Sequence, residues 1–184
     1  MNIEVNRLLA RISRGDTAAL ETLYGLLKNG VYLYALSMLK SRESAEDVLQ
    51  DTFVRIFERA GTHAPGRDGR AWIFTIVHNM CLDRLKSSSR SVLPLDSGEE
   101  QMIPANADFV RDFELKEALL QLEEKPRSVL LLHLAAGLRF REIADLLNEK
   151  QSSVERLYYS SVKKLSSCYE AAQSKGADSS ETGL

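Results

Sequence analysis

Cysteine and histidine are scarce in this sequence of 184 residues, which has two cysteines, Cys81 and Cys168, and three histidines. Neither cysteine lies in a CxxC pair or at the spacing of a Cys/His zinc site, which fits a reduced compartment and predicts no bound metal. A glycine-rich phosphate loop, a nucleophile elbow and an HExxH motif are absent as well. We therefore expect no catalytic residue and no cofactor, and we interpret the chain as something other than an enzyme.

Long apolar runs are missing too. No stretch approaches the roughly 20 apolar residues that span a bilayer, and residues 1–10 lack the basic and then apolar pattern of a secretory signal. We therefore expect no membrane insertion and a cytoplasmic location. The hydrophobic content of 44% is enough for one ordinary domain or two small ones, each with a modest core.

Net charge is small, at -2, so the chain as a whole is not a general binder of polyanions. The charges are nevertheless uneven along the sequence. Residues 67–90 contain five basic and two acidic side chains, whereas residues 96–124 contain nine acidic and two basic ones. Any contact with nucleic acid must therefore come from locally concentrated charge.

Apolar residues recur at helical spacing through most of the chain, and no alternating run is long enough for a sheet. Serines, Pro94, Gly98 and Pro104 interrupt the pattern between Ser87 and Ala107, as expected of a connector between independently folded units. We therefore predict an all-α fold of two small helical domains joined by a flexible linker, the second containing a helix-turn-helix. The expected helices are 2–14, 16–28, 30–40, 42–60, 69–89, 108–123, 126–136, 139–147 and 152–169. The expected domains are 1–88 and 107–170, with a linker at 89–106 and a disordered tail at 171–184.

The helix expected at 42–60 has an apolar stripe and a polar face. The apolar positions recur at i, i+3, i+4 and i+7, and the stripe includes Phe53 and Phe57. The opposite face carries Glu46, Asp47, Gln50, Asp51 and Arg55. Spacing alone favours a solvated surface with no partner, because most surface helices look this way.

The helix expected at 69–89 combines an aromatic residue with polar and basic ones. Trp72 lies near its start, and Asn79, Asp83 and Lys86 approach the side opposite the apolar stripe. Basic groups can neutralise phosphates, an aromatic ring can stack on a base and an amide can hydrogen-bond a base edge, which together suit melted DNA. A tryptophan at such a position is more often a core residue, so both interpretations stay open.

A helix-turn-helix is predicted in the second half of the chain. Residues 141–147 form a short amphipathic helix, residues 148–150 form the turn, and the recognition helix starts at Ser152. Ser152 and Glu155 have the spacing of a capping box, which gives Glu155 a structural role. Similar helix pairs occur in purely structural bundles, and the local pattern leaves that alternative open.

Two separated segments resemble the conserved regions of extracytoplasmic-function sigma factors of bacterial RNA polymerase. Residues 45–55 (AEDVLQDTFVR) resemble the AEDxxQxxF motif of that family, and residues 71–86 (AWIFTIVHNMCLDRLK) resemble its AWLxxIxxNxxxDxxR motif. Residues 122–132 and 137–144 resemble the helix entry and the helix-turn-helix of the family's region four. The resemblance extends over nearly all of 15–165.

This resemblance implies an alternative sigma factor that binds core RNA polymerase and directs promoter recognition and transcription initiation. It implies that Glu46, Asp47, Gln50, Asp51 and Arg55 dock on the polymerase clamp helices. It also implies that the loop 61–69 captures a flipped base of the minus-ten element. The residues expected to contact promoter DNA are Arg70, Trp72, Asn79, Asp83, Arg84, Lys86, Arg90, Ser152, Ser153, Arg156, Tyr159 and Lys163. An anti-sigma factor is a further expected partner, and the free protein is expected to be a monomer.

Some positions depart from the family pattern. Asn148 and Glu149 stand in the turn where members usually have a glycine and an apolar residue, and serines at 87–89 replace a common arginine run. Usual basic positions of the recognition helix are here Glu155, Leu157, Ser160 and Val162. Because each missing phosphate contact weakens binding, we predict weak intrinsic DNA binding by the second domain.

Three other functions stay open. A sigma mimic would share both folds and bind an anti-sigma factor without productive DNA binding, which the thinned basic face favours. A helix-turn-helix repressor would leave the first half unexplained, and a small α-helical enzyme would lack titratable groups placed for catalysis. The retained Asn79, Asp83 and Arg84 favour the sigma factor over the mimic.

Overall fold

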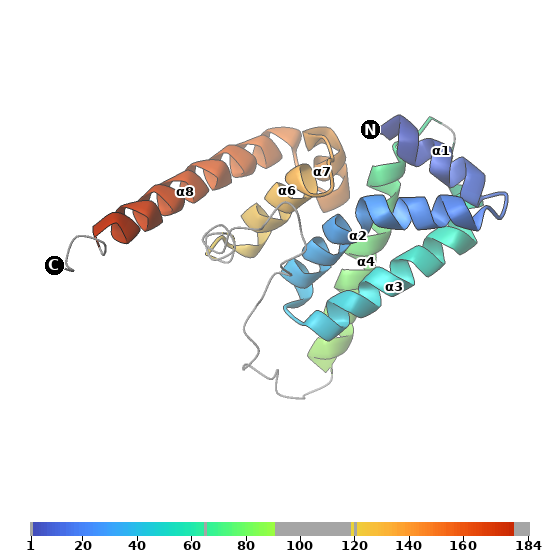
Figure 1. Cartoon of the computed structure of the whole chain (residues 1–184), viewed down its shortest axis with the longest axis horizontal. Helices are drawn as coiled ribbons and strands as arrows, with labels where there is room; N and C mark the ends of the chain where they lie inside the picture. Colours follow the sequence, from blue (N-terminus) through green and yellow to red (C-terminus); the bar gives the residue numbers. More distant parts are fainter. Residues whose placement is uncertain (1, 65, 91–118, 120, 179–184) are drawn as a thin grey trace.

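The computed structural model describes residues 2–64, 66–90, 119 and 121–178. All regular elements in these ranges are helices, which confirms the predicted all-α fold (Figure 1). They are α1 (Asn2–Ile12), α2 (Thr17–Leu39), α3 (Arg42–Arg59), the short 3-10 helix η1 (Ala60–Thr62), α4 (Gly69–Arg90), α6 (Glu124–Leu134), α7 (Phe140–Leu147) and α8 (Gln151–Asp178). In the part of the chain that is described, no helix combines the length and the apolarity needed to cross a bilayer.

Helices α1 to α4 pack around a shared core, with α2 in contact with the other three. Asp16 starts α2 by accepting the backbone N–H of Ala19 at 3.0 Å, and Ser41 starts α3 by accepting that of Ser44 at 3.2 Å. Such caps satisfy backbone donors that have no partner within the helix. The buried side chains of this core include Leu23, Leu27, Ala45, Val48, Ile73 and Val77.

Helix α2 is continuous, whereas the sequence predicted two helices at 16–28 and 30–40. Gly30 is buried inside the helix and not at a break. A Cβ at this position would lie 2.8 Å from the carbonyl oxygen of Ala135, so the glycine permits a close approach of the chain after α6. The neighbours Leu27 and Val31 continue the buried stripe across it, which explains why the helix does not end there.

Helices α6, α7 and α8 form the predicted helix-turn-helix unit. The turn between α7 and α8 starts at Asn148, whose φ of 53° lies in the left-handed region. Glycine takes this conformation most easily, and asparagine is among the side chains that tolerate it best. Asn148 therefore preserves the turn in place of the usual glycine, and the backbone N–H of Glu149 donates to Ala144 at 2.9 Å.

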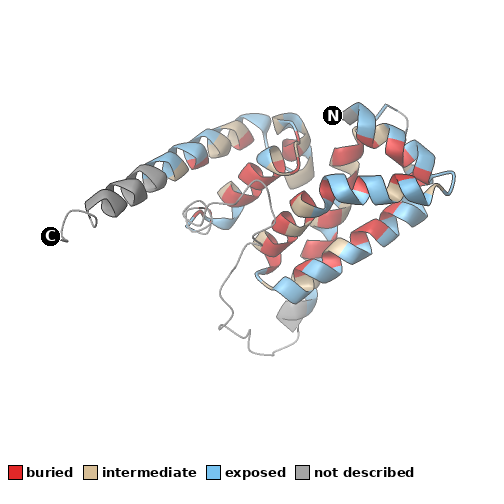
Figure 2. Cartoon of the chain, viewed as in Figure 1, coloured by how far each residue is buried: buried red, intermediate tan, exposed pale blue. Residues whose placement is uncertain are grey.

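The two halves of the chain pack against each other. Helix α6 lies against α2, and α7 lies against α4. Leu33 of α2 is buried beside Leu119, Leu122 and Leu130, and a larger apolar cluster joins buried side chains of both halves. The buried residues of α2 and α6 accordingly lie along the surfaces that face each other (Figure 2). The sequence predicted independently folded units, but here each half covers apolar surface of the other.

Some expected boundaries fall outside the described residues. The predicted linker at 89–106 and the helix predicted at 108–123 lie mostly within 91–118 and 120. Helix α8 continues to Asp178, beyond the expected end at 169 and into the segment 171–184 that we expected to be disordered. Residues 170–173 have the sequence EAAQ, whose high helix propensity allows an existing helix to extend at little cost.

Candidate functional site

The outward face of α3 carries the polar side chains that the sequence singled out. Glu46, Asp47, Gln50, Asp51 and Arg55 are all exposed, while the opposite stripe of the same helix is buried. This is the expected result of a 3.6-residue period, which places the two sets on opposite sides. The acidic and amide groups therefore form one accessible surface.

Apolar side chains extend this surface toward the end of α3. Val54 is 56% exposed and Phe57 is 42% exposed, although Phe57 was predicted to be buried. Next to them, the ring of Tyr24 on α2 lies edge-on to Phe53, with ring centroids 4.9 Å apart. The pattern missed Phe57 because it lies at the margin of the stripe, near the end of the helix, where less of the core remains to cover it. The sequence feature that could have predicted this exposed apolar surface was Val54, an apolar residue outside the stripe.

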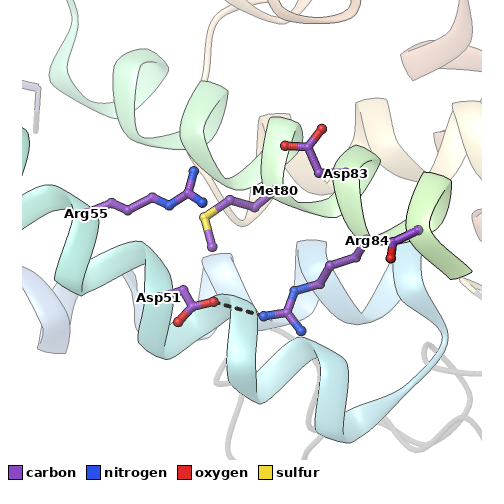
Figure 3. A pocket seen from close by; sticks show the side chains of 6 residues that line it. Asp51, Arg55, Met80, Asp83 and Arg84 are labelled. Carbon is purple, nitrogen blue, oxygen red and sulfur yellow. Dashed lines mark hydrogen bonds and ion pairs between the residues drawn. The ribbon is translucent and has the colours of Figure 1, made fainter.

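Arg84 of α4 connects the acidic side chains of α3. Its Nη1 donates to Asp47 Oδ2 at 3.0 Å, and its Nη2 donates to Asp51 Oδ2 at 2.9 Å. Figure 3 shows Arg84 reaching from α4 to Asp51 on the neighbouring helix. The Arg84 side chain is 32% exposed and both aspartates are 55% exposed, so each pair contributes only about 0.2–1 kcal/mol. Helices α3 and α4 are thus joined by charges that remain open to solvent.

A hollow of about 270 Å³ lies beside this ion pair, between α3 and α4. It is lined by Asp51, Arg55, Met80, Asp83, Arg84 and Ser87. Figure 3 shows that Arg55 lies next to Met80 on the far side of the hollow from Arg84. Within the described part of the chain, neither Arg55 nor Asp83 forms an ion pair, so both charges can meet a partner.

The outward side of α4 bears the polar residues expected to meet DNA. Asn79, Asp83 and Lys86 are exposed, and Arg84 is partly exposed. Arg90 ends the helix, and its side chain lies outside the described residues. The segment therefore presents an amide, a carboxylate and basic groups along one helix, in the spacing that the motif predicts.

Trp72 packs against the loop that precedes α4. Its ring lies at 66° to the imidazole of His63, with ring centroids 5.6 Å apart, and Trp72 is half-buried. The sequence left a core role and a DNA-facing role open for this residue. Its intermediate burial is compatible with both, because one part of the ring supports the loop and another part is accessible.

Asn6 of α1 holds the end of the same loop. Its Oδ1 accepts the backbone N–H of Gly69 at 2.8 Å, and its Nδ2 donates to the carbonyl oxygen of Arg67 at 3.1 Å. Sequence reasoning missed this residue. The available signal was a polar side chain next to Val5, on the apolar side of an amphipathic helix.

Arg70 is not exposed in this arrangement, contrary to the prediction that it contacts DNA. It retains only 4% of its accessible surface, and its Nη1 donates to the carbonyl oxygen of Ala136 at 2.8 Å. Burial lowers the pKa of its guanidinium from the usual value. The packing of the two halves explains the difference, because the turn after α6 covers the start of α4. A contact between Arg70 and DNA would require the halves to separate.

The predicted recognition helix α8 exposes a mostly neutral face. Ser152, Arg156, Tyr159 and Lys163 are exposed, and Ser153 is partly buried. The predicted capping box is wrong, because α8 starts at Gln151, before Ser152. Glu155 instead accepts a hydrogen bond at 2.8 Å from the Gln151 side chain.

An aromatic cluster packs against Tyr159. His133 stacks on Phe140 with ring centroids 4.5 Å apart, and Tyr158 lies edge-on to both His133 and Tyr159. The His133 Nδ1 also shares a hydrogen bond of 2.8 Å with the carbonyl oxygen of Leu138. His133 is therefore a packing residue, and the rings that it contacts, Phe140 and Tyr158, pack in turn against a Tyr159 that remains 64% exposed.

Metal-ligating clusters were not expected. Among the described residues, no three or more His, Cys, Asp or Glu side chains come together in a way that could hold a metal ion.

Comparison with known proteins identifies two conserved regions. The sigma-70 region 2 family matches residues 23–91, and the sigma-70 region 4 family matches residues 112–165. The ECF RNA polymerase sigma factor SigL of Mycobacterium tuberculosis is 30% identical over 161 residues, which are 82% of this chain and 91% of that protein. The ECF RNA polymerase sigma factor BldN of Streptomyces coelicolor is 29% identical over 169 residues, 86% of this chain but only 63% of BldN.

A solved structure shows the same fold. The sigma factor RpoE in complex with the anti-sigma factor NepR from Bartonella quintana matches with a TM-score of 0.61 and 18% identity. The match covers 82% of this chain and 96% of that one. The proteins similar to this chain are transcription regulators and not enzymes.

Proposed function

Because the chain belongs to the extracytoplasmic-function (ECF) sigma factors, we propose that it binds core RNA polymerase and directs promoter recognition and transcription initiation. The observation that carries this proposal is the pairing of two surfaces inside the region 2 match. An acidic and amide face on α3 lies directly beside a polar and basic face on α4. A protein that must hold polymerase and DNA at the same time needs two such surfaces side by side.

The polymerase contact is proposed for the face of α3. Its residues Glu46, Asp47, Gln50, Asp51 and Arg55 are exposed and aligned along one side of a rigid helix. Val54 and Phe57 add exposed apolar area at the end of the same helix. Interfaces of this kind combine a polar rim with a few apolar anchors, and α3 offers both.

The DNA contact is proposed for α4, the loop before it and α8. The loop 61–69, supported by Asn6 and Trp72, would hold a flipped base of the minus-ten element. Further DNA contacts are proposed for Asn79, Asp83, Arg84, Lys86 and Arg90, and in α8 for Ser152, Ser153, Arg156, Tyr159 and Lys163. Arg70 belongs to this set only when the two halves have separated enough to expose it, whereas Trp72 is already partly accessible when the halves are packed together.

We further propose that the chain has domains at 1–88 and 107–170, acts in the cytoplasm as a monomer when free, and carries out no catalysis itself. An anti-sigma factor is proposed as its regulator, since RpoE of the same fold was solved with the anti-sigma factor NepR. Such a partner would compete with polymerase for the exposed faces.

A sigma mimic is the second candidate, and one observation favours it. The exposed face of α8 has Ser160 and Val162 where basic residues are usual in the family, and the partly buried Glu155 adds a negative charge at another such position. A helix of this kind loses phosphate contacts and suits a protein partner better than DNA.

Run-off transcription separates the two candidates. Purified core polymerase and promoter fragments from the source genome are combined with the wild-type chain or with the Asp47→Ala, Gln50→Ala variant. We expect specific transcripts from the wild type and none from the variant. The control Glu21→Ala removes one exposed carboxylate from α2, away from the proposed face of α3, and it should transcribe normally. Stable binding to polymerase or to an anti-sigma factor without any transcript would favour the mimic.

A further inference from the structure

Arg84 joins two sets of residues for which we propose different partners. Asp47 and Asp51 belong to the polymerase face of α3, whereas Arg84 belongs to the DNA face of α4. In the free chain, both carboxylates bind the guanidinium, at 3.0 and 2.9 Å. Figure 3 shows the contact with Asp51. In the free chain, Asp47 and Asp51 therefore hold the Arg84 guanidinium that we propose for DNA. Arg84 in turn holds the two carboxylates that we propose for polymerase.

We propose that Arg84 is exchanged between these partners. It is held by Asp47 and Asp51 in the free protein, and it is released to a DNA phosphate when polymerase binds the two carboxylates. The inference rests on the proposed function, because it takes polymerase and promoter DNA as the two partners. It adds a reason for cooperative binding: occupation of the α3 face by polymerase increases the affinity of the chain for DNA.

The geometry suits one cation held by two anions. Asp47 and Asp51 are four residues apart on α3, so they lie one above the other on the same face and repel each other. The planar guanidinium offers two separate N–H groups, Nη1 and Nη2, and each meets one carboxylate. A partner that displaces Arg84 must supply its own hydrogen-bond donors or positive charge to both aspartates.

The exposure of the ion pairs makes the exchange easy. All three side chains are in contact with solvent, at 32% exposure for Arg84 and 55% for each aspartate. One exposed ion pair shifts an equilibrium by about 1.4- to fivefold, which is enough to bias binding and small enough to be reversed by a partner. Arg70 differs, because it is buried and its guanidinium bonds a backbone carbonyl of the other half.

The released guanidinium has space beside it. The hollow between α3 and α4 is lined by Arg84 together with Asp83 and Ser87 of α4, next to the surface proposed for DNA. In the proposed exchange, Arg84 changes its side-chain rotamer to turn from α3 to this side. Because binding linkage is reciprocal, a phosphate that takes Arg84 also frees Asp47 and Asp51 for polymerase by the same factor.

DNA binding by the free full-length chain tests the exchange. The probe is a fluorescein-labelled oligothymidylate strand, which offers phosphates without a promoter sequence, followed by fluorescence anisotropy. We expect the Asp47→Asn, Asp51→Asn variant to bind about two- to fivefold more tightly than the wild type, with a salt slope steeper by about 0.7 for one added phosphate contact. Adding Arg84→Gln should abolish this gain, although Arg84→Gln alone should change little.

Two controls protect the interpretation. Glu43→Gln, Glu58→Gln adds the same positive charge to α3 without touching Arg84, and it should leave binding near the wild-type value. Arg84→Lys keeps the charge but cannot reach both carboxylates with a planar fork, so it should bind the probe more tightly than the wild type even with both aspartates intact. The Arg84→Lys variant also tests the exchange if the Asp47→Asn, Asp51→Asn variant fails to fold.

The exchange is wrong if the double asparagine variant shows no gain, if the gain survives Arg84→Gln, or if Glu43→Gln, Glu58→Gln produces the same gain. Failure of the proposed function is recognised separately, by the absence of run-off transcripts from the wild-type chain with core polymerase. Transcription without the expected pattern of probe binding overturns only the exchange.

Discussion

Gly30 of α2 and Ala135 after α6 meet so closely that a Cβ on Gly30 would lie 2.8 Å from the Ala135 carbonyl oxygen. The neighbouring ring of Phe74 would lie 3.5 Å from the same Cβ. Side chains do not tolerate a backbone atom at the first distance, and a backbone carbonyl cannot rotate away as a flexible side chain can. This one contact therefore sets how closely the two halves of the chain can pack.

Gly30→Ala should weaken that packing. We expect the free energy of unfolding to fall by about 1–3 kcal/mol, as in other overpacked sites. Gly25→Ala in the same helix is the matched control, because nothing lies within 4 Å of its Cβ position. Removing a glycine from a helix interior should stabilise the control by about 0.5–1 kcal/mol. Urea unfolding followed by circular dichroism measures both, and equal effects would contradict the prediction.

Phe57→Ser should weaken polymerase binding without unfolding the chain. Phe57 is 42% exposed, so its removal costs the folded state only part of the burial energy of a phenylalanine. At an interface, an apolar anchor often contributes about 1 kcal/mol or more, which is about fivefold or more in affinity. Binding to core polymerase can be measured by fluorescence anisotropy with a labelled chain. Ile3→Ser changes an apolar side chain on α1 that is 69% exposed, and it should bind normally. If both variants bind like the wild type, the apolar end of α3 is not part of the interface.

The stability of the chain should depend on pH through His78. This residue shares a hydrogen bond of 2.8 Å with the Tyr34 hydroxyl, and burial lowers the pKa of His78 below its usual 6.5. The unfolded chain therefore takes up a proton more readily, so the stability that His78 contributes is present above pH 6.5 and is lost as the pH falls through the lowered pKa. We expect the free energy of unfolding to decrease below pH 6.5.

The His78→Gln variant isolates this effect. Burial raises the pKa of Glu142, which contributes an opposite trend at lower pH, so the wild type alone is not sufficient. The difference in unfolding free energy between wild type and variant should shrink as the pH falls below 6.5. A difference that stays constant with pH would show that His78 does not titrate in this range.

Cys81 should be protected from thiol reagents in the folded chain. It is fully buried, and burial raises the pKa of its thiol to about 12, so almost no thiolate is present near neutral pH. In a Cys168→Ser variant, Cys81 is the single thiol of the sequence. We expect Ellman's reagent to react slowly in buffer and rapidly in urea. Rapid reaction in buffer would mean that α4 separates from the core without global unfolding.

The helices were largely predictable because their apolar stripes are local. The predicted starts of α3 at 42 and α4 at 69 agree with the structure, since each is an amphipathic segment that follows an interruption of the pattern. The failure at Gly30 has a different origin. A glycine that breaks a helix and a glycine that admits a neighbouring backbone look the same in sequence, and only the contact with Ala135 distinguishes them.

The candidate site was predictable as faces but not as contacts. The period of α3 placed Asp47 and Asp51 on one exposed side, and the structure agrees. The ion pairs to Arg84 join residues 37 and 33 positions apart, and they depend on how α3 and α4 are rotated against each other. Arg70 shows the same limit, because its burial depends on the packing of a segment that lies 66 positions away. The roles of these residues toward polymerase and DNA stay predictions.

The two hydrogen bonds of Asn6 have a practical consequence for testing the role proposed for the loop 61–69, by exchanging this loop between sigma factors. The backbone of the loop 61–69 is held at Arg67 and Gly69 by a side chain from the first helix. A chimera that receives this loop alone would lack the Asn6 side chain that holds the backbone of the loop. A chimera designed to transfer the specificity proposed for the loop would therefore have to include residue 6 as well.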